Sequence, residues 1–166
     1  MDNNELMHYG VKGMKWGVHR ASKQLDKGYA TGNTAKVQKA TAKLEKHRDK
    51  AQKKINKLSK SNEKLEKKRD RQIIRNEPRI GKLDQRATRY ISKANSFFTS
   101  ERSRNRLMNK ANKYKIEANR LKAISEATKA EIAKNNKLSS IYSKGINDID
   151  KALATNGKDY VNKYAN

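Results

Sequence analysis

The sequence contains no cysteine, and it has only one proline and one tryptophan among its 166 residues. The absence of cysteine excludes disulfides and thiolate metal sites, and it leaves the cellular compartment open. No run approaches about 18 apolar residues, so we expect no membrane span. The N-terminus also lacks the continuous apolar segment of an ordinary secretory signal peptide.

Apolar residues are scarce as well. Hydrophobic residues make up 34% of the chain and aromatic residues 6%, and the mean hydropathy is −1.17. Such a chain can bury a narrow seam but not a thick globular core. Because Lys, Ala, Asn and Glu are abundant while Pro and Gly are few, helix is favoured over coil. We therefore predict an all-α fold of long basic helices with narrow heptad stripes, as a helical hairpin, a small bundle or an extended coiled-coil-like structure.

Positive charge is what the chain has in excess. There are 41 Lys and Arg residues against 17 Asp and Glu, giving a net charge of +24 at pH 7. A compact protein of this charge repels itself unless something anionic neutralises it. Nucleic acid, an anionic membrane surface and an acidic protein are the candidate partners, and nucleic acid is favoured because its charge density is the largest.

Residues 1–32 hold five of the eight glycines. We expect this segment to be irregular, because the glycines at 10, 13 and 17 break any helix through 10–17. A short helix over Ala21–Lys27 that stops at Gly28 is compatible with the pattern. The stretch TGNT, 31–34, predicts a turn that ends in a plausible N-cap.

A long basic helix is predicted over 33–76. Its apolar positions recur every seven residues, at Val37, Leu44, Ala51, Leu58 and Leu65. Fifteen basic and five acidic residues lie between Lys36 and Arg71, so the other faces must be strongly positive. Pro78 should end this helix or bend it sharply.

A second helical region is predicted over 80–136, and its apolar stripe changes phase, which predicts a kink or short break near 99–104. After Asn135–Lys137 we expect a C-terminal helix over 138–155 and a tail over 156–166 that follows Asn156-Gly157. Four aromatic residues, Tyr90, Phe97, Phe98 and Tyr114, lie on or near the stripe. We expect them in the core rather than as platforms for nucleic-acid bases.

No pattern indicates catalysis. No acidic residue stands at metal-motif spacing from His8, His19 or His47. The carboxylates alternate with lysines in the way that supports exposed helices. The stretch GVKGMKWG lacks both the spacing of a phosphate-binding loop and a preceding strand. We expect no enzyme activity, no cofactor and no metal.

The candidate polyanion-binding residues are cations of the predicted helices. Lysine suits contact with phosphates without fixed geometry, and arginine suits bidentate contact. No helix-turn-helix, zinc-finger or sheet-borne aromatic motif is present. The candidates are Lys43, Lys46, Lys50, Lys53, Lys54, Lys57, Lys60, Lys64, Lys67, Lys68, Arg69, Arg71, Arg86, Arg89, Arg102, Arg104 and Arg106.

The segment HYGVKGMKWGVHR resembles a short motif, roughly H-x-G-x-x-G-x-K-W-G-V-R-R, found near an end of many bacteriophage and prophage proteins that are often encoded among head and structural genes. The matching residues are His8, Gly10, Gly13, Lys15, Trp16, Gly17, Val18 and Arg20, and His19 replaces the common arginine. The resemblance covers about 13 residues of the chain. It implies a portable docking tag on a minor structural or internal virion protein.

The residues themselves fit such a tag, because glycines let a backbone approach a surface closely and tryptophan is a common interface anchor. The alternative is that Trp16 packs onto the chain's own helices. The resulting hypothesis is a virion-associated protein that docks to a capsid, portal or other head protein and contacts packaged double-stranded DNA or an acidic surface non-specifically, with a homo-oligomer possible. It would reside in the virion, and in the cytoplasm of the infected host during assembly. The alternatives are a structural adaptor or scaffold and a host-acting phage regulator.

Overall fold

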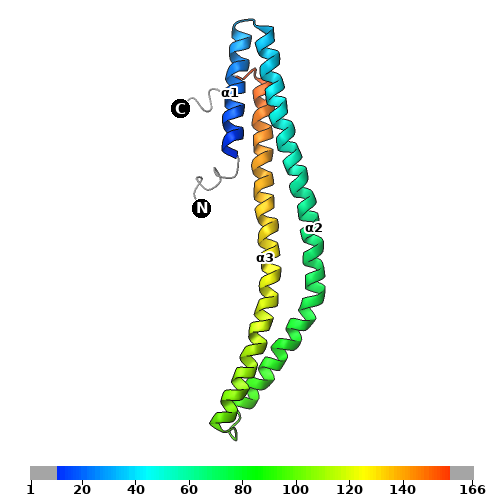
Figure 1. Cartoon of the computed structure of the whole chain (residues 1–166), viewed down its shortest axis with the longest axis vertical. Coiled ribbons are helices and arrows are strands. Elements are labelled where there is room, and N and C mark those ends of the chain that lie inside the picture. Colours follow the sequence, from blue (N-terminus) through cyan, green and yellow to red (C-terminus); the bar gives the residue numbers. More distant parts are fainter. Residues whose placement is uncertain (1–10, 158–166) are drawn as a thin grey trace. The chain divides into compact units, whose positions relative to one another are not determined.

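The computed structural model describes the backbone of residues 11–157 and the side chains of residues 17–157. This part of the chain forms three helices and no strand: α1 (Val11–Ala30), α2 (Thr34–Ala94) and α3 (Glu101–Ala154) (Figure 1). The predicted all-α fold is confirmed. The chain divides into two compact units, which we call the three-helix unit (1–59 and 136–166) and the two-helix unit (60–135).

In the three-helix unit, α1 packs against the first part of α2 and the last part of α3. The apolar residues of α1 follow the three-to-four spacing of a helix that buries one face. The core consists of Val18, Ala21, Leu25, Ala40, Leu44, Ile149 and Ala152. At its edge, the Arg48 guanidinium pairs with the Asp150 carboxylate across 3.1 Å.

The helix ends of this unit follow ordinary capping chemistry. Gly32, with a φ of 63°, reverses the chain between α1 and α2. The Asn33 side-chain oxygen then accepts a hydrogen bond from the Lys36 N–H at 3.0 Å, which caps α2. Asn156 and Gly157 both have positive φ after α3, and the Gly157 N–H donates to the Ala152 carbonyl at 2.7 Å. The turns predicted at 31–34 and at Asn156-Gly157 are therefore confirmed.

In the two-helix unit, α2 and α3 pack antiparallel along a seam of mostly small residues. Its buried members are Leu83, Ala87, Ala94, Ala111, Ala118, Thr128 and Ile132. Two polar pairs cross this seam. The Asn135 amide donates to the Asn62 side-chain oxygen at 2.8 Å, and the Thr128 hydroxyl donates to the Gln72 side-chain oxygen at 3.2 Å. Paired polar groups of this kind fix the register of two helices.

Residues 95–100 form the turn that joins α2 to α3. The Thr99 hydroxyl donates to the Lys93 carbonyl at 2.8 Å, and Arg104 Nε donates to the Ala94 carbonyl at 3.1 Å. These bonds satisfy carbonyls that the end of α2 would otherwise leave without donors. Of the kink or short break predicted near 99–104, the structure has the break: the turn begins four residues earlier, at Asn95, and it reverses the chain.

The predicted irregular segment at 10–17 and the helix stop at Gly28 are wrong within the described residues. α1 is continuous from Val11 to Ala30 and includes Gly13, Gly17 and Gly28. Glycine lowers helix propensity by only about 1 kcal/mol. Burial of the apolar face of α1 offsets that cost.

The helix end predicted at 135–137 is also wrong. Of the two outcomes predicted for Pro78, the helix end is wrong, whereas α2 does bend in its green part (Figure 1). α2 continues through Pro78, which leaves the Ile74 carbonyl without its helical N–H donor. Because Ile74 is 76% exposed, water can reach this part of the helix. α3 continues past Asn135, whose side chain is bonded across the seam and does not compete with the helix backbone. The separate helices predicted over 80–136 and 138–155 are therefore replaced by α3 and the end of α2.

Candidate functional site

One side of α2 in the two-helix unit carries a row of cations. Lys64, Lys68, Arg71, Arg75 and Arg79 follow one another at intervals of three or four residues, and we call them the basic stripe. At 3.6 residues per turn they fall within roughly 80° of the helix circumference and extend over about 22 Å. The five positive charges therefore lie on one side of α2.

The carboxylates of the same stretch lie elsewhere on the helix. Glu63, Glu66, Asp70 and Glu77 fall within roughly 60° of arc, centred roughly 150° from the basic stripe. The stripe is thus not interleaved with the acids of its own helix. Segregation of this kind gives one side of the helix a potential of a single sign.

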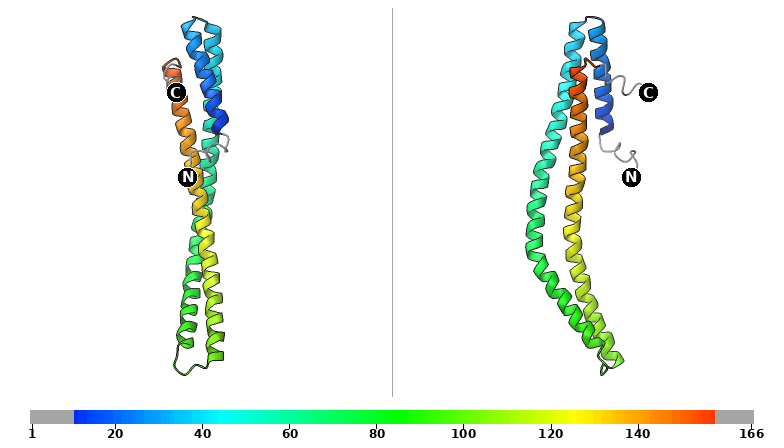
Figure 2. Two further views of the ribbon diagram at one scale, coloured as in Figure 1. Left: turned by 90° about the vertical axis from the view of Figure 1, so that its left-hand side faces the viewer. Right: turned by 180° about the vertical axis from the view of Figure 1, so that it is seen from behind.

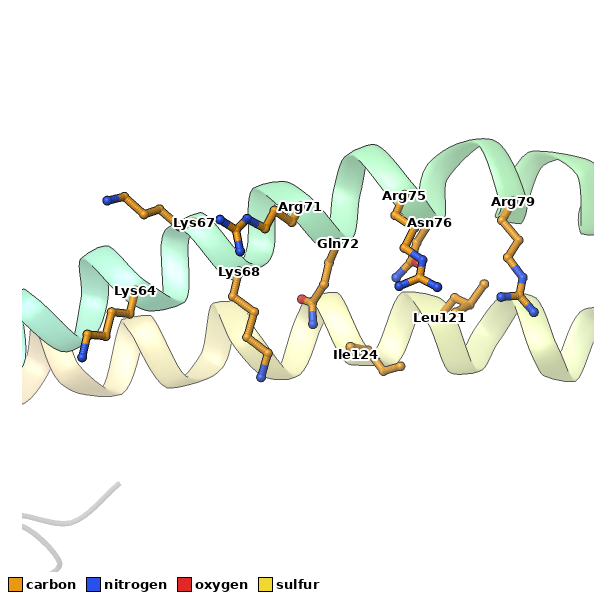
Figure 3. Close-up of a pocket in the computed structure, with 10 residues that line it drawn as sticks. All are labelled: Lys64, Lys67, Lys68, Arg71, Gln72, Arg75, Asn76, Arg79, Leu121 and Ile124. Atoms are coloured by element: carbon orange, nitrogen blue, oxygen red, sulfur yellow. The ribbon is translucent and has the colours of Figure 1, made fainter.

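The basic stripe borders an open groove of about 620 Å³ between α2 and α3. Figure 3 shows Lys68 and Arg79 extending from α2 toward α3, whereas Lys67 points away from it. Leu121 and Ile124 line the groove from α3. The groove thus combines apolar side chains with cations on its α2 side. Its lining comprises Lys64, Lys67, Lys68, Arg71, Gln72, Arg75, Asn76, Arg79, Leu121 and Ile124.

One member of the basic stripe is already neutralised. Arg79 pairs with Glu117 of α3. Within residues 17–157 no ion pair involves any of the other four members. These four cations are exposed and can contact an external anion without breaking an ion pair of the protein.

Most of the other predicted cations of α2 are exposed too. In the three-helix unit these are Lys46, Lys50, Lys53 and Lys57, and in the two-helix unit Lys60 and Lys67. Arg69 differs, because it pairs with Asp70 across 3.2 Å.

Three predicted cations make hydrogen bonds within the protein. Lys43 Nζ donates to the Gln24 side-chain oxygen at 3.1 Å. Lys54 Nζ donates to the Tyr142 hydroxyl at 3.1 Å, and Arg104 holds the end of α2 as described above. For Lys54 and Arg104, these bonds within the protein explain the presence of a cation as well as a contact with phosphate would.

Near the turn, cations flank a pair of tyrosines. The rings of Tyr90 and Tyr114 are stacked with centroids 5.7 Å apart. Arg86 lies 5.9 Å from the centre of the Tyr114 ring, and Lys110 lies 5.7 Å from that of Tyr90. The tyrosines are half-buried and occupied with each other and with these cations. Arg89, Arg102 and Arg106 are exposed.

Sequence reasoning missed part of the basic stripe and misplaced two aromatic residues. Arg75 and Arg79 continue the spacing set by Arg71. Arg75 lies inside the helix predicted over 33–76 and was not recognised as part of the row, whereas Arg79 lies beyond the expected end of that helix. Phe97 and Phe98 were expected in the core, and each is 94% exposed. They lie in the turn between α2 and α3, where no seam continues.

The resemblance motif falls partly outside the described residues. This applies to His8 and Gly10, and to the side chains of Lys15 and Trp16. Gly13, Lys15 and Trp16 have backbone positions in α1. Arg20, which follows in the same helix, is exposed.

The last part of the motif is built into the three-helix unit. Val18 is 3% exposed and belongs to the core. A Cβ atom added to Gly17 would lie 2.7 Å from two ring atoms of His47 in α2, so this glycine permits a close approach between α1 and α2. Gly17 and Val18 therefore pack inside this chain and do not form a free docking surface.

His47 is the one titratable group within residues 17–157 whose pKa is clearly displaced. Burial, and to a smaller extent the nearby charges of Lys50 and Lys46, lower the pKa of its imidazole. The neutral ring that packs on Gly17 is thus favoured at neutral pH. Within the same residues, no group of three His, Asp or Glu side chains is placed to hold a metal ion.

Comparison with known proteins bears on the N-terminal segment alone. Residues 1–23 match a family of unknown function (DUF7211). No curated protein and no solved structure matches the chain. The match contains the whole HYGVKGMKWGVHR segment and ends within α1. Among the helices of residues 11–157, none is long and apolar enough to cross a membrane.

Proposed function

We propose that this chain is a phage virion-associated protein that contacts packaged duplex DNA through the basic stripe without reading its sequence, and that docks to a capsid, portal or other head protein through its N-terminal segment. The observation that carries the DNA contact is the segregation of cations from carboxylates on α2. Charge of one sign along a helix recognises a polyanion by its charge density.

The dimensions of the basic stripe suit this role. The two DNA strands together carry one charge about every 1.7 Å of the helix axis, so a stripe of about 22 Å lies within reach of phosphates from both strands. The four unpaired members of the stripe are mobile side chains that can each meet one phosphate. Neither base-edge readout nor a fixed DNA register is required.

The docking role is supported by two facts about the N-terminus. The resemblance to a phage motif and the family match at residues 1–23 both concern this segment and do not extend to α2 or α3. Because Gly17 and Val18 are occupied inside the chain, the docking surface would consist of the motif residues before Gly17 together with Arg20.

The test of the DNA contact is a salt titration of binding to a labelled duplex of about 30 base pairs, followed by fluorescence anisotropy. With four phosphates neutralised, the plot of log K against log salt should have a slope of about −3.6 or steeper. The variant Lys68→Gln/Arg75→Gln removes two of these contacts. Its slope should become shallower by about 2, with weaker binding at every salt concentration.

The matched control is Lys113→Gln/Arg120→Gln, which removes one lysine and one arginine from α3 of the same unit. Each of these residues follows a buried alanine, Ala111 or Ala118, by two positions and so lies roughly 200° from the seam. Its slope should change by less than about 0.5. Equal losses in both variants would mean that net charge alone drives binding. No binding at about 50 mM salt would reject the DNA contact.

A further inference from the structure

Both phenylalanines of the chain stand on the turn between α2 and α3. Phe97 and Phe98 are each 94% exposed, and their ring centres lie 5.7 Å apart with the ring planes at 90°. Figure 2 shows this turn at the end of the pair formed by α2 and α3. Large apolar residues are few in this chain, and these two do not pack in its core. Exposed apolar side chains that lie together indicate a contact with another molecule.

The backbone of the turn is satisfied in part, by bonds within the turn and to the end of α2. The Ser96 N–H donates to the Lys93 carbonyl at 3.3 Å, and the Thr99 N–H donates to the Ser96 carbonyl at 3.1 Å. The Thr99 hydroxyl bonds to the Lys93 carbonyl as well. These paired groups lose little when they enter a less polar medium. The Phe97 and Phe98 N–H groups make no backbone hydrogen bond within residues 11–157, so the hydrated interfacial layer of a bilayer suits the turn and its dry core does not.

Cations surround the turn in sequence. The last two turns of α2 and the first two turns of α3 contain Arg89, Lys93, Arg102, Arg104 and Arg106, and they contain a single acid, Glu101. Within residues 17–157, none of these groups takes part in an ion pair. The surface that receives the two rings must therefore be anionic.

We propose that the turn 95–100 is a membrane-contacting tip, in which Phe97 and Phe98 enter the interfacial layer of an anionic lipid bilayer while the neighbouring arginines contact lipid phosphates. Aromatic rings beside basic groups are the chemistry of interfacial lipid binding. A contact of this kind requires no membrane-spanning helix. It is independent of the DNA contact proposed for the basic stripe.

The ring geometry favours lipid over nucleic acid. A base stacks on a free and flat aromatic face. The planes of Phe97 and Phe98 are perpendicular, so the two rings cannot both stack on successive parallel bases. Acyl chains and glycerol groups accept an aromatic ring in any orientation, so this arrangement costs a bilayer contact nothing.

The absence of cysteine permits a site-specific test. The variant Phe98→Cys carries one polarity-sensitive fluorophore, and Ile74→Cys, at a position in α2 that is 76% exposed, carries the same label as a control. Vesicles of phosphatidylcholine with about 30% phosphatidylglycerol should shift the emission of the label at 98 to the blue, whereas pure phosphatidylcholine should not. The label at 74 should not shift with either vesicle, even when the protein adsorbs through its net charge.

Unlabelled variants measure the contribution of the rings. Phe97→Ser/Phe98→Ser should weaken partitioning to the anionic vesicles by roughly 100-fold, about tenfold for each ring. Ile74→Ser/Ile116→Ser, which removes two other exposed apolar side chains, should change it by less than about threefold. Equal losses in the two variants, or no shift of the label at 98, would overturn the proposal. A shift at 98 with duplex or single-stranded DNA but not with vesicles would assign the tip to nucleic acid and overturn it as well.

Discussion

Replacement of Gly17 by alanine tests whether the motif glycine is needed for packing between α1 and α2. The new Cβ would lie 2.7 Å from Cε1 and Nε2 of His47, about 1 Å inside the ~3.5–4.0 Å of an ordinary carbon contact. Overpacking of this kind costs about 1–3 kcal/mol, and a displaced imidazole reduces the cost. Alanine also gains about 1 kcal/mol over glycine in a helix. We expect a net destabilisation of about 0–2 kcal/mol.

The coupling between the two residues is a sharper quantity than the single substitution. In a His47→Ala background no ring opposes the new methyl group, so Gly17→Ala should stabilise the protein by the full ~1 kcal/mol of helix propensity. The interaction free energy of the double-mutant cycle should therefore be at least about 1 kcal/mol. Urea unfolding followed by far-ultraviolet circular dichroism gives the four stabilities. Amide exchange in α1 shows that the change arises in the three-helix unit.

Gly81 supplies the control. It lies in α2, and an added Cβ would meet nothing within 4 Å, so Gly81→Ala should stabilise by about 0.5–1 kcal/mol in either background. If Gly17→Ala stabilises the wild type as much as it stabilises the His47→Ala variant, packing on His47 does not explain the glycine. The glycine would then be available to a docking partner.

Three further outcomes are expected. Because the folded-state pKa of His47 is lowered, the free energy of unfolding should fall as the pH drops below the unfolded-state pKa of about 6.5. His47→Gln should remove this decrease from a plot of urea midpoint against pH. A plot that His47→Gln leaves unchanged contradicts the assignment to His47. Gly157→Ala combines a φ of 88° with a Cβ only 2.3 Å from the Ser22 carbonyl oxygen, so thermal unfolding should show a loss of roughly 2–4 kcal/mol. Trp16→Ala should abolish incorporation into purified phage particles without loss of helix content, and a normal copy number would reject the docking role.

The existence of the helices could be predicted from the sequence, whereas their lengths could not. Leu44 and Ala51, from the seven-residue series, are fully buried. Turn chemistry located Gly32 and Asn156 correctly. Local breakers were overestimated, because Pro78 and Gly17 lie in helices that packing along the rest of their length holds together. Helix propensity is local, and the packing that overrides it is not.

The basic stripe was only partly predictable for the same reason. Its first three members were among the candidate cations, and Arg75 could have been added because it lies inside the predicted helix 33–76. Arg79 could not, because it lies beyond the expected end of that helix. The polar pairs Asn62–Asn135 and Gln72–Thr128 could not be predicted, since they depend on the register of two segments far apart in sequence. The exposed phenylalanines were misplaced because a change of phase in the apolar pattern marks a kink or a reversal equally well.

The composition of the seam explains why large apolar residues are left for the surface. In the two-helix unit, every residue with an exposure of 1% or less is an alanine, namely Ala87, Ala94, Ala111 and Ala118. Small side chains let two helices approach closely, and the distance between helix axes depends on the residues at the contact. Each alanine buries little apolar area, so a long seam of alanines is needed to bury the area that a few large side chains would bury. Leucine or phenylalanine in place of one of these alanines would push the helices apart and widen the groove beside the basic stripe. The alanines of the seam therefore determine both how closely α2 and α3 pack and how wide the groove beside the basic stripe is.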